Sequence, residues 1–554
     1  MKRQQDLSQF FKKRSKTSEG IENSATTQSA SAESSSQPEA STSNEIIDVV
    51  GKLIRRKIVE EVNTAKFFTV LVDETVDVSK ADQLTVCLRY VTPKDGQQVL
   101  RESFLSFCVV KSKTGAALAE SILKLLRDEG IVVSNMRGQG YDGCSSMSGI
   151  YKGVQAELRK VVPQALYFHC ASHCLNLAIA HSVDNTSIKL TIGTIASTCA
   201  FISASSHRVR LLQDSVELNL PESSARRLKP LCPTRWVESH KAYITFRELL
   251  VPIVRTLEAL ANEPGDQGAR ANELLSTICK CGFVVSLFVL ERFAALFLPL
   301  SVQLQARDLD IFEAQEAIES IATVLRASRG DAERDFREIF AEASSICAEL
   351  EVDVRLPRLC GRQIHRENHS VDGVEDYFRI SVYIPYADRL IEEFDSMFEG
   401  IREHATKLQF LLPKFVENSS FDDLADALVF YETDLNCEDS VVREEYRRWK
   451  IKWSSVPGGA KPATAIDALN HCSPRYFPKI ATLLQIFATL PVTTASAERT
   501  FSCLRLLKTY LRSVMIEERL NGLTSMHLQP DISVTPEEVL DVLALNPRKL
   551  NLIL

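Results

Sequence analysis

One segment of the chain reads Phe67-Phe68-Thr69-Val70-Leu71-Val72, a continuous apolar run that ends at Asp73. Such a run is typical of a central strand that is buried on both faces of a sheet. Residues 84–90 alternate between apolar and more polar side chains, as a half-buried strand does, and 104–110 give a third strand. An amphipathic helix is expected over 114–128, followed by a fourth strand from Ile131. Three strands, a helix and a further strand predict an α/β sheet layer.

The remainder of the chain changes in composition along its length. The tail 1–43 is rich in Ser and Thr and poor in apolar residues, so it is expected to be disordered. Ordered structure should begin near Asn44, where apolar residues recur at helical spacing. Helical patterns dominate from about 185 to 470, and a final helical segment follows residues 476–491. The chain is therefore predicted to carry a large α-helical block after its sheet.

Bulk composition excludes some functional classes. The formal net charge of −7 argues against a protein that coats nucleic acid by overall charge, although a local basic groove is compatible with it. Fourteen cysteines without a secretory signal at the N-terminus indicate a reducing compartment. The most apolar stretch, 283–300, is interrupted by Glu291, Arg292 and Pro299. We therefore expect a buried core helix there and no membrane span.

Three acidic residues occupy positions that suit metal-dependent chemistry. Asp73 ends the first strand, Asp142 follows the fourth strand, and Glu498 lies far downstream. Carboxylates at the ends of neighbouring strands converge at one edge of a sheet, where they can share Mg²⁺ with phosphate oxygens. Phosphoryl transfer at such a site depends on positioning and charge neutralisation. The alternative is structural, because an Asp commonly caps a turn and a Glu commonly interacts with the dipole of a helix start.

Several blocks of sequence between about 44 and 528 carry a family resemblance. The first two are 67–75 with 83–91, and Gly138-Gln139-Gly140-Tyr141-Asp142-Gly143 with Met147-Ser148-Gly149. Two more are 169–177 and 234–236. The most specific is Leu490-Pro491-Val492 with Ser496-Ala497-Glu498-Arg499-Thr500-Phe501-Ser502, continued by 507–512 and 518–521. Together they resemble animal hAT-superfamily DNA transposases and their host descendants, of the zinc finger MYM-like or repressor-of-the-protein-kinase-inhibitor type.

The resemblance implies a fold and a domain order. The fold is α/β, an RNase H-like mixed sheet with a large all-α insertion and a C-terminal helical dimerisation segment. The first part of the catalytic core is expected over 44–240 and the helical insertion over 241–470. The dimerisation segment, 471–530, completes the core, and a C-terminal tail occupies 531–554.

The resemblance also implies roles for the three acids. Asp73, Asp142 and Glu498 correspond to the family's catalytic and metal-binding Asp-Asp-Glu triad. In active relatives such residues bind Mg²⁺ or Mn²⁺ and drive DNA strand cleavage and transfer. An active chain would therefore be a divalent-metal-dependent DNA transposase.

Arg235 and Trp236 resemble DNA-binding residues placed near the transposon ends. A guanidinium can hold a phosphate there, and an indole can stack on an unpaired base. The alternative is a packed Trp beside a surface Arg.

The cluster His169, Cys170, His173 and Cys174 has the residue types of a zinc site. Positions i, i+3 and i+4 share one face of a helix. All four fall within six residues, however, without the distant second pair that structural zinc sites use. Zinc is therefore not expected, and a helix packed against the active site is the preferred interpretation.

The sequence also departs from the family. Relatives carry a Cys/His finger ahead of the catalytic domain, whereas the first cysteine here is Cys87, so no such finger is expected. Recognition of specific DNA ends is correspondingly in doubt. Cys144 and Ser146 differ from the small residue and Asn expected after the second Asp.

The N-terminal tail contains a second motif. Gln4, Leu7, Phe10 and Phe11 fit the pattern of peptides that bind the sliding clamp PCNA. One helical turn would place the three apolar side chains in a single pocket, with Gln4 bound separately. The alternative is a chance match to a short motif.

Two functional interpretations remain from the sequence. The first is a dimeric, nuclear, transposase-like protein whose partners are itself, DNA and divalent metal. The second is a domesticated or truncated interaction protein without catalysis. In either case, self-association is expected to use the apolar face of the last helical segment, which comprises Leu504, Leu507, Leu511, Leu520 and Leu523.

Overall fold

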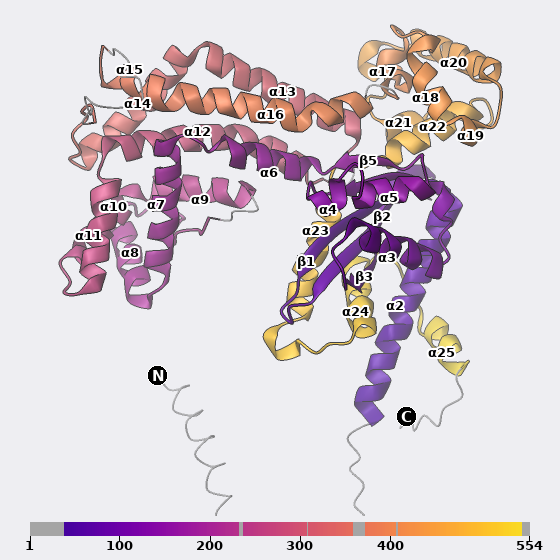
Figure 1. Cartoon of the computed structure of the whole chain (residues 1–554), viewed down its shortest axis with the longest axis horizontal. Coiled ribbons are helices and arrows are strands. Elements are labelled where there is room, and N and C mark those ends of the chain that lie inside the picture. Colours follow the sequence, from indigo (N-terminus) through magenta and orange to yellow (C-terminus); the bar gives the residue numbers. More distant parts are fainter. Residues whose placement is uncertain (1–37, 232–235, 307–308, 358–371, 406–407, 546–554) are drawn as a thin grey trace, which may run out of the picture. The chain divides into compact units, whose positions relative to one another are not determined.

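The computed structural model describes residues 38–231, 236–306, 309–357, 372–405 and 408–545 (Figure 1). The described residues from Ile47 onward form one compact unit. Helix α2 (Pro38–Ala65) leads into the sheet. The strands are β1 (Phe68–Val76), β2 (Asp82–Lys94), β3 (Gln97–Val109), β4 (Met136–Tyr141) and β5 (Leu166–His169).

The five strands form one mixed sheet in the order β3-β2-β1-β4-β5. The pairs β1–β2 and β2–β3 are antiparallel, whereas β1–β4 and β4–β5 are parallel. This arrangement, together with the many helices around it, confirms the predicted RNase H-like α/β fold. In this register Asp73 of β1 lies opposite Thr85 of β2.

Successive side chains of β1 and β2 point to opposite faces of the sheet, and each face packs against a different layer of helices. Val70 and Val72 lie in one apolar cluster with α2, α3 (Gly115–Asp128) and α5 (Val154–Val161). Leu71 and Cys87 lie in another cluster with α23 (Ala495–Leu507) and α24 (Glu517–Leu528). Because side chains alternate across a strand, Asp73 shares the face of Leu71 and is directed toward the layer that contains α23.

Glycines in β4 permit close packing at the centre of the sheet. A Cβ at Gly138 would lie 2.2 Å from the hydroxyl oxygen of Thr69, and one at Gly140 would lie 2.9 Å from a methyl carbon of Leu71. Both would also press on Pro491, at 3.0 and 3.2 Å. The Gly-Gln-Gly block is therefore explained by the approach of β1 and of the segment that leads into α23.

A large helical block follows the sheet, confirming the all-α insertion expected from the sequence. Its core joins residues from α6 to α22 in one apolar cluster. A five-residue π-helical turn, Arg379–Tyr383, lies between α15 and α16. The helices between α3 and α5 and after β5 are α4 (Ser145–Ser148), α6 (Ala171–Ser182), α7 (Thr186–Ser203), α8 (Ser206–Asn219), α9 (Trp236–Glu248), α10 (Leu250–Ala261), α11 (Asp266–Ile278), α12 (Cys281–Gln303), α13 (Ile311–Gly330), α14 (Ala332–Glu349), α15 (Val374–Phe378), α16 (Ile384–Ala405), α17 (Pro413–Val416), α18 (Ala425–Phe430), α19 (Glu432–Leu435), α20 (Asp439–Ser454), α21 (Ala465–Asn470), α22 (Pro478–Thr489) and α25 (Pro536–Ala544).

Some boundaries differ from the sequence prediction. The fourth strand begins at Met136 and not at the predicted Ile131. Ile131 and Val132 lie in the connection from α3, where Ile131 is buried and Val132 is about half exposed. The short strand β5 was not predicted, since four residues give little periodic signal. Within the region of helical patterns, α11 and α12 are separate helices that break between Ile278 and Cys281.

Helix α12 is long and apolar enough to cross a membrane by composition alone. Its most apolar window is 67% buried inside the described part of the chain, as in the core helix of a folded domain. A bent pair, α7 with α8, passes the same test only if counted as one broken span. The structure therefore agrees with the core-helix prediction for 283–300.

Candidate active site

Three acidic side chains from distant parts of the sequence come together at one edge of the sheet. Asp73 lies in β1, Asp142 directly follows β4, and Glu498 lies in the first turn of α23. Burial raises the pKa of Asp73 well above its ordinary value, and repulsion from Glu498 and then from Asp142 raises it further. Asp73 thus lies close enough to both Glu498 and Asp142 for their charges to act on its carboxylate.

A pair of buried threonines ties Glu498 to the strand that carries Asp73. Thr500, in the turn of α23 that follows Glu498, is hydrogen-bonded through its hydroxyl to the hydroxyl of Thr85 at 2.9 Å. Both threonines are almost completely buried. Since Thr85 lies opposite Asp73 in the sheet, this bond fixes the height of α23 over β1 and β2.

The end of α23 is anchored to the end of β1 by a buried ion pair. The Lys508 ammonium lies 2.5 Å from the Asp77 carboxylate, and both side chains are less than a tenth exposed. Burial alone would raise the pKa of Asp77, but hydrogen bonds from Lys508, Ser79, Gln83 and the backbone N–H of Ala81 lower it well below its ordinary value. Together with the threonine pair, this contact holds both ends of α23 on the sheet.

Asp142 is held by a tight turn after β4. One of its carboxylate oxygens accepts a hydrogen bond from the backbone N–H of Cys144 at 3.3 Å. The next residue, Gly143, packs directly on the His169 ring, where a Cβ would lie 2.5 Å from Cε1. Gly143 therefore allows the backbone that follows Asp142 to pass close to the His169 ring at the end of β5.

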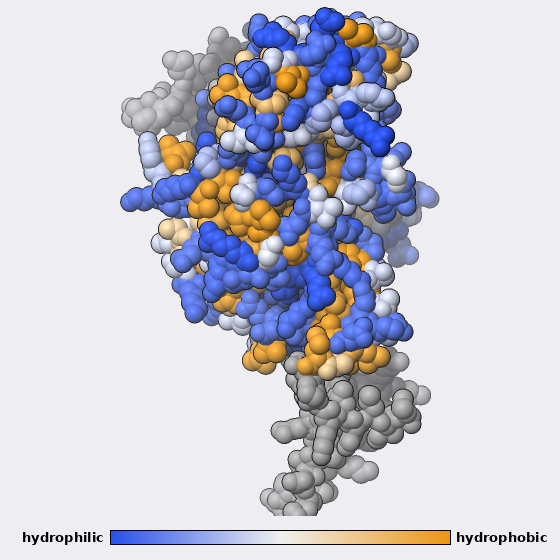
Figure 2. Space-filling view, turned by 90° about the vertical axis from the view of Figure 1, so that its right-hand side faces the viewer, coloured by the Kyte–Doolittle hydropathy of each residue, from blue (hydrophilic) through white to orange (hydrophobic). Residues whose placement is uncertain are grey.

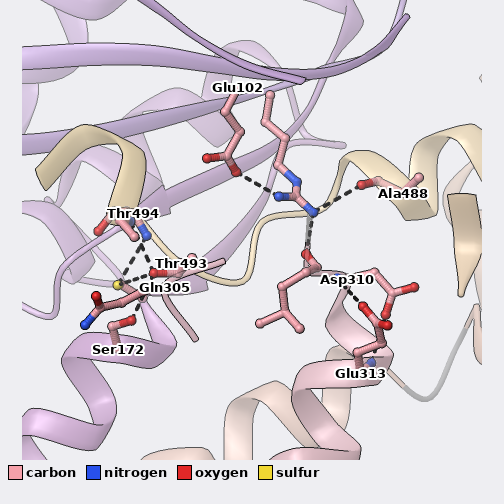
Figure 3. Close-up of polar contacts among 12 residues, drawn as sticks. Glu102, Ser172, Gln305, Asp310, Glu313, Ala488, Thr493 and Thr494 are labelled. Carbon is pink, nitrogen blue, oxygen red and sulfur yellow. Dashed lines mark hydrogen bonds and ion pairs between the residues drawn. The ribbon is translucent and has the colours of Figure 1, made fainter. Parts of the chain in front are cut away.

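The His-Cys block connects the second acid to the third. The backbone N–H of Cys170 donates to the carbonyl of Tyr141, which directly precedes Asp142, and that of Ala171 donates to the carbonyl of Val492, both at 2.9 Å. The Cys170 sulfur accepts from the backbone N–H of Thr494 at 3.3 Å. Figure 3 shows this contact region, in which Ser172 faces Thr493 near Gln305. The block thus joins β4 and β5 to the start of α23.

His169 is an unusual member of this block. Burial, with a smaller effect from nearby His173, lowers the pKa of His169 to about 4, although Asp142 opposes the shift. The ring is therefore neutral at physiological pH. Its Nε2 atom is buried and has no hydrogen-bond partner among the described residues. The two histidine rings lie 5.5 Å apart, against the edge of the acidic site.

The donor set fits a divalent cation in its chemistry. A fourth carboxylate, Glu74, has a pKa raised by burial and by the neighbouring Asp142, although Lys113 opposes the shift. One Glu74 oxygen is buried without a hydrogen-bond partner. Mg²⁺ and Mn²⁺ prefer such oxygen ligands, and a bound cation would relieve the repulsion that raises the pKa of Asp73. Within the described residues, however, no three His, Cys, Asp or Glu side chains are already arranged to hold a metal ion.

The helical insertion is bonded to the sheet beside this site. Arg89 of β2 is fully buried, pairs with Glu102 of β3 at 2.7 Å, and donates to the carbonyls of Leu309 and Ala488. In Figure 3 Glu102 and Ala488 lie on opposite sides of this junction, with Asp310 below them. Asp310 caps α13 and accepts a hydrogen bond from the backbone N–H of Ala465. The connection into α13 is therefore fixed to both the sheet and the chain returning from the insertion.

A second set of bonds holds the end of α12 next to the third acid. The Arg499 guanidinium, one residue after Glu498, donates to the carbonyl of Gln305. Ser172 of α6 donates to the carbonyl of Leu304 at 3.1 Å. Arg499, which directly follows Glu498, thus attaches the end of α12 in the helical insertion to α23.

Several predicted residues lie where the structure gives no side-chain description. Arg235 lies outside the described residues, and Trp236 begins α9 with a side chain that is not described. The clamp-binding motif, Gln4, Leu7, Phe10 and Phe11, also lies outside the described residues. Their roles stay predictions.

The predicted dimerisation leucines occupy different environments. Leu504 and Leu520 are 3% and 1% exposed and pack with β2 and β3 of their own chain. Leu507 and Leu523 are partly buried, and the side chain of Leu511 is not described. Burial of Leu504 and Leu520 within the chain means that any contribution they make to self-association is indirect.

Sequence reasoning missed the residues that position the acids. Thr85, Thr500, Asp77 and Lys508 have no special pattern, because a buried hydrogen bond or ion pair between distant segments leaves no periodic signal. Glu74 carried the only local signal, since it directly follows Asp73 at the end of the strand.

Comparison with known proteins agrees with the geometry. Residues 3–153 match the ZMYM1/FAM200 RNase-like domain, and residues 472–532 match the hAT family C-terminal dimerisation region. The first match contains Asp73 and Asp142, and the second contains Glu498.

Two relatives align with most of the chain. The 52 kDa repressor of the inhibitor of the protein kinase is 26% identical over 501 residues in Homo sapiens and 26% identical over 500 residues in Mus musculus. Each alignment covers 88% of this chain, and the chain spans 65% of the length of these relatives. With the two family matches, they agree with the resemblance found in the sequence: one part of the chain is similar to an RNase-like domain and another to a hAT C-terminal dimerisation region.

Proposed function

We propose that the chain is a nuclear, dimerising, hAT-type transposase-like protein whose Asp73, Asp142 and Glu498 cleave and transfer DNA strands with Mg²⁺ or Mn²⁺. The observation that carries the proposal is the placement of the acids: Asp73 lies in β1, Asp142 directly follows β4, and Glu498 lies in the first turn of α23, where it and Asp142 add to the effect of burial on the pKa of Asp73. Capping roles alone would not require acids from three separate elements to face one another. Placing two further carboxylates near the buried Asp73 is costly to a fold unless a cation or a proton occupies the site.

The chemistry divides between the cation and the chain. Bound divalent ions would supply the positive charge that activates the attacking oxygen and stabilises the leaving oxygen. The three acids would hold the ions. The neutral His169 ring and the buried Cys170 would exclude water beside Asp142 and Glu498. The bonds of Thr500 and Lys508 would keep the third acid at a fixed distance from the first.

For self-association, we infer that the contact surface is the exposed apolar set Leu506, Tyr510, Val514 and Ile516. These side chains lie at the end of α23 and in the connection to α24, inside the segment that matches the hAT dimerisation region. Tyr510 and Val514 are 88% and 90% exposed. The face on the right-hand side of Figure 1 likewise carries apolar patches among hydrophilic residues (Figure 2). Such patches commonly mark protein–protein contacts.

Self-association has a direct test. Light scattering of the full chain at micromolar concentration should give a dimer, and Tyr510→Glu with Val514→Glu should give a folded monomer. A wild-type monomer, or an unchanged dimer in the double variant, would contradict the assigned surface.

The second candidate is a non-catalytic nuclear interaction protein that acts through dimerisation. It is favoured by the name of the two relatives, which are described as repressors, and by the lack of a preformed set of three metal-binding side chains among the described residues. The clustering of the acids opposes it. Nuclear localisation is common to both candidates and can be checked by imaging a tagged full-length chain.

We also keep the clamp-binding proposal for the N-terminal tail. A peptide carrying Gln4, Leu7, Phe10 and Phe11 should bind purified PCNA, and replacing both phenylalanines by alanine should abolish binding. Equal binding by both peptides, or by neither, would remove PCNA from the partners.

The experiment that separates the two main candidates is metal-dependent DNA cleavage. Supercoiled plasmid should be nicked by the full chain with Mg²⁺ or Mn²⁺ but not with EDTA. Asp73→Asn, Asp142→Asn and Glu498→Gln should each lower the rate by about 10²-fold or more, as when one stabiliser of a transition state is removed. Glu120→Gln, an exposed residue of α3, is the matched control and should retain the wild-type rate. Wild-type activity equal to that of the three variants would leave the non-catalytic candidate.

A further inference from the structure

A basic pocket lies between residues 224–229 and α9, and none of its lining residues belongs to the acidic site. Its volume is about 540 Å³. The first wall comes from residues 224–229 and the second from the helix. The charged side chains that line it are Arg226, Arg227, Lys229, Lys241 and Glu248.

The positive charge in this pocket is poorly compensated. Its one carboxylate, Glu248, already accepts a hydrogen bond from the Ser223 hydroxyl at 2.6 Å. Among the described residues, Arg227, Lys229 and Lys241 form no ion pair. Four cations with one acid thus surround a hollow in a chain whose formal net charge is −7. Such local excess favours an anionic ligand.

Arg226 is held in place, unlike the lysines. Its guanidinium donates to the backbone carbonyls of Leu220 at 3.4 Å and Pro221 at 3.0 Å. Leu228 and Thr245, which also line the pocket, are buried and form its base. Lys229 and Lys241 are exposed at the rim, so their charge can be changed without disturbing the core. The pocket therefore combines one guanidinium that is hydrogen-bonded in place, that of Arg226, with three cations that form no ion pair among the described residues.

We propose that this pocket binds phosphate groups of a DNA strand, at a site separate from the three acids. The hollow is larger than one phosphate needs, and its cations come from two separate segments, which suits successive phosphates of one strand better than a single small anion. Arg and Lys side chains are the usual partners of phosphate oxygens. The choice of DNA rests on the proposed function, whereas the anionic character of the ligand rests on the pocket alone.

The test is DNA binding without catalysis. A fluorescein-labelled oligonucleotide is titrated with the full chain in EDTA, and anisotropy is read at several salt concentrations. Lys229→Glu with Lys241→Glu should weaken binding roughly tenfold or more and reduce the slope of log affinity against log salt by about one per lost phosphate contact. Lys280→Glu, an exposed lysine at the start of α12, is the matched control and should bind as the wild type does.

Two further arms give decisive outcomes. If the wild-type chain fails to cleave DNA but keeps pocket-dependent DNA binding in EDTA, the proposed catalysis is rejected and this inference is kept. Unchanged DNA binding in the double lysine variant overturns the inference. So does pocket-dependent binding of ATP or inorganic phosphate that leaves DNA affinity untouched, since it assigns the pocket to a free phosphorylated ligand.

Discussion

The hydroxyl groups of Thr500 and Thr85 are hydrogen-bonded at 2.9 Å, across 415 positions of sequence. Thr500 follows Glu498 by less than one helical turn, and Thr85 faces Asp73 in the sheet. One buried bond therefore sets the relation between the first and third acids of the candidate site. The same bond explains why α23 must pack on the sheet before the site is complete.

Replacing Thr500 by Val should lower metal-dependent DNA cleavage about 10- to 100-fold, the range observed when residues that orient metal ligands are lost. The change removes the bonds to Thr85 and to the carbonyl of Ala497 while keeping the side-chain shape. The loss of stability should be about 1–3 kcal/mol, because the buried Thr85 hydroxyl loses this partner. Cleavage rates and urea unfolding of the same preparations check both values.

A conservative substitution separates positioning from packing in this case. Thr500→Ser keeps the hydroxyl and should recover most of the cleavage rate. If Val and Ser variants lose activity equally, the bond does not position Glu498.

Replacing Asp73 by Asn should raise the thermal stability of the metal-free protein at neutral pH. Because the folded-state pKa of Asp73 lies above its unfolded value of about 3.9, the folded state keeps a proton that the unfolded chain releases. Stability due to this group is therefore lost as pH rises from about 4 through the raised pKa, and Asn removes that loss. Melting temperatures measured in EDTA from pH 4 to pH 8 should diverge as pH rises. If the melting temperatures of the wild type and of Asp73→Asn differ by the same amount at every pH, the pKa of Asp73 is not raised in the folded protein.

Replacing Lys508 by Met should destabilise the protein by about 3–5 kcal/mol, since it leaves the Asp77 carboxylate buried without its cation. The pKa of Asp77 is lowered in the folded state, so the stability it contributes is present above the unfolded pKa of about 3.9 and lost as pH falls through the folded value. The effect of Lys508→Met should thus be full at pH 7 and shrink below about pH 4.

The double variant provides the control for the ion pair. Adding Asp77→Asn to Lys508→Met should restore part of the lost stability, because no buried charge remains unpaired. Urea unfolding that gives additive losses for the two changes would contradict a direct interaction.

Replacing Gly143 by Ala should impair cleavage by displacing the turn that holds Asp142. The added Cβ would lie 2.5 Å from the His169 ring, a distance that forces one of the two to move. Gly143→Ala combined with His169→Ala provides the space and should recover activity relative to Gly143→Ala alone. If the double variant is no better than the single one, the ring is not what constrains the turn.

The sequence predicted most of the sheet side of this site, for physical reasons. The run that ends at Asp73 carries a strong local signal, because a strand buried on both faces is apolar. The Gly-Gln-Gly block before Asp142 carries another, because the face of β4 that contacts Pro491 has no room for side chains. The fourth strand was placed early because Ile131 and Val132 have strand-forming side chains but lie in a connection.

The rest depends on contacts between distant segments. The bonds of Thr85 with Thr500 and of Asp77 with Lys508 join residues more than 400 positions apart, and nothing in either local segment predicts its partner. The burial of Leu504 and Leu520 has the same origin: an apolar helical face predicts burial but does not say whether the partner is the chain's own sheet or a second subunit. The basic pocket likewise combines cations from two segments that separately resemble ordinary solvated surface.

The central claim is that Asp73, Asp142 and Glu498 form one cation-binding site, and Mn²⁺ binding by calorimetry tests it most directly. The full chain should bind Mn²⁺, with affinity that increases as pH rises through the raised pKa of Asp73. Asp73→Asn, Asp142→Asn and Glu498→Gln should each weaken binding at least about tenfold, while Glu120→Gln should not. Wild-type affinity in all three acid variants, or no Mn²⁺ binding by the wild type, would contradict the account.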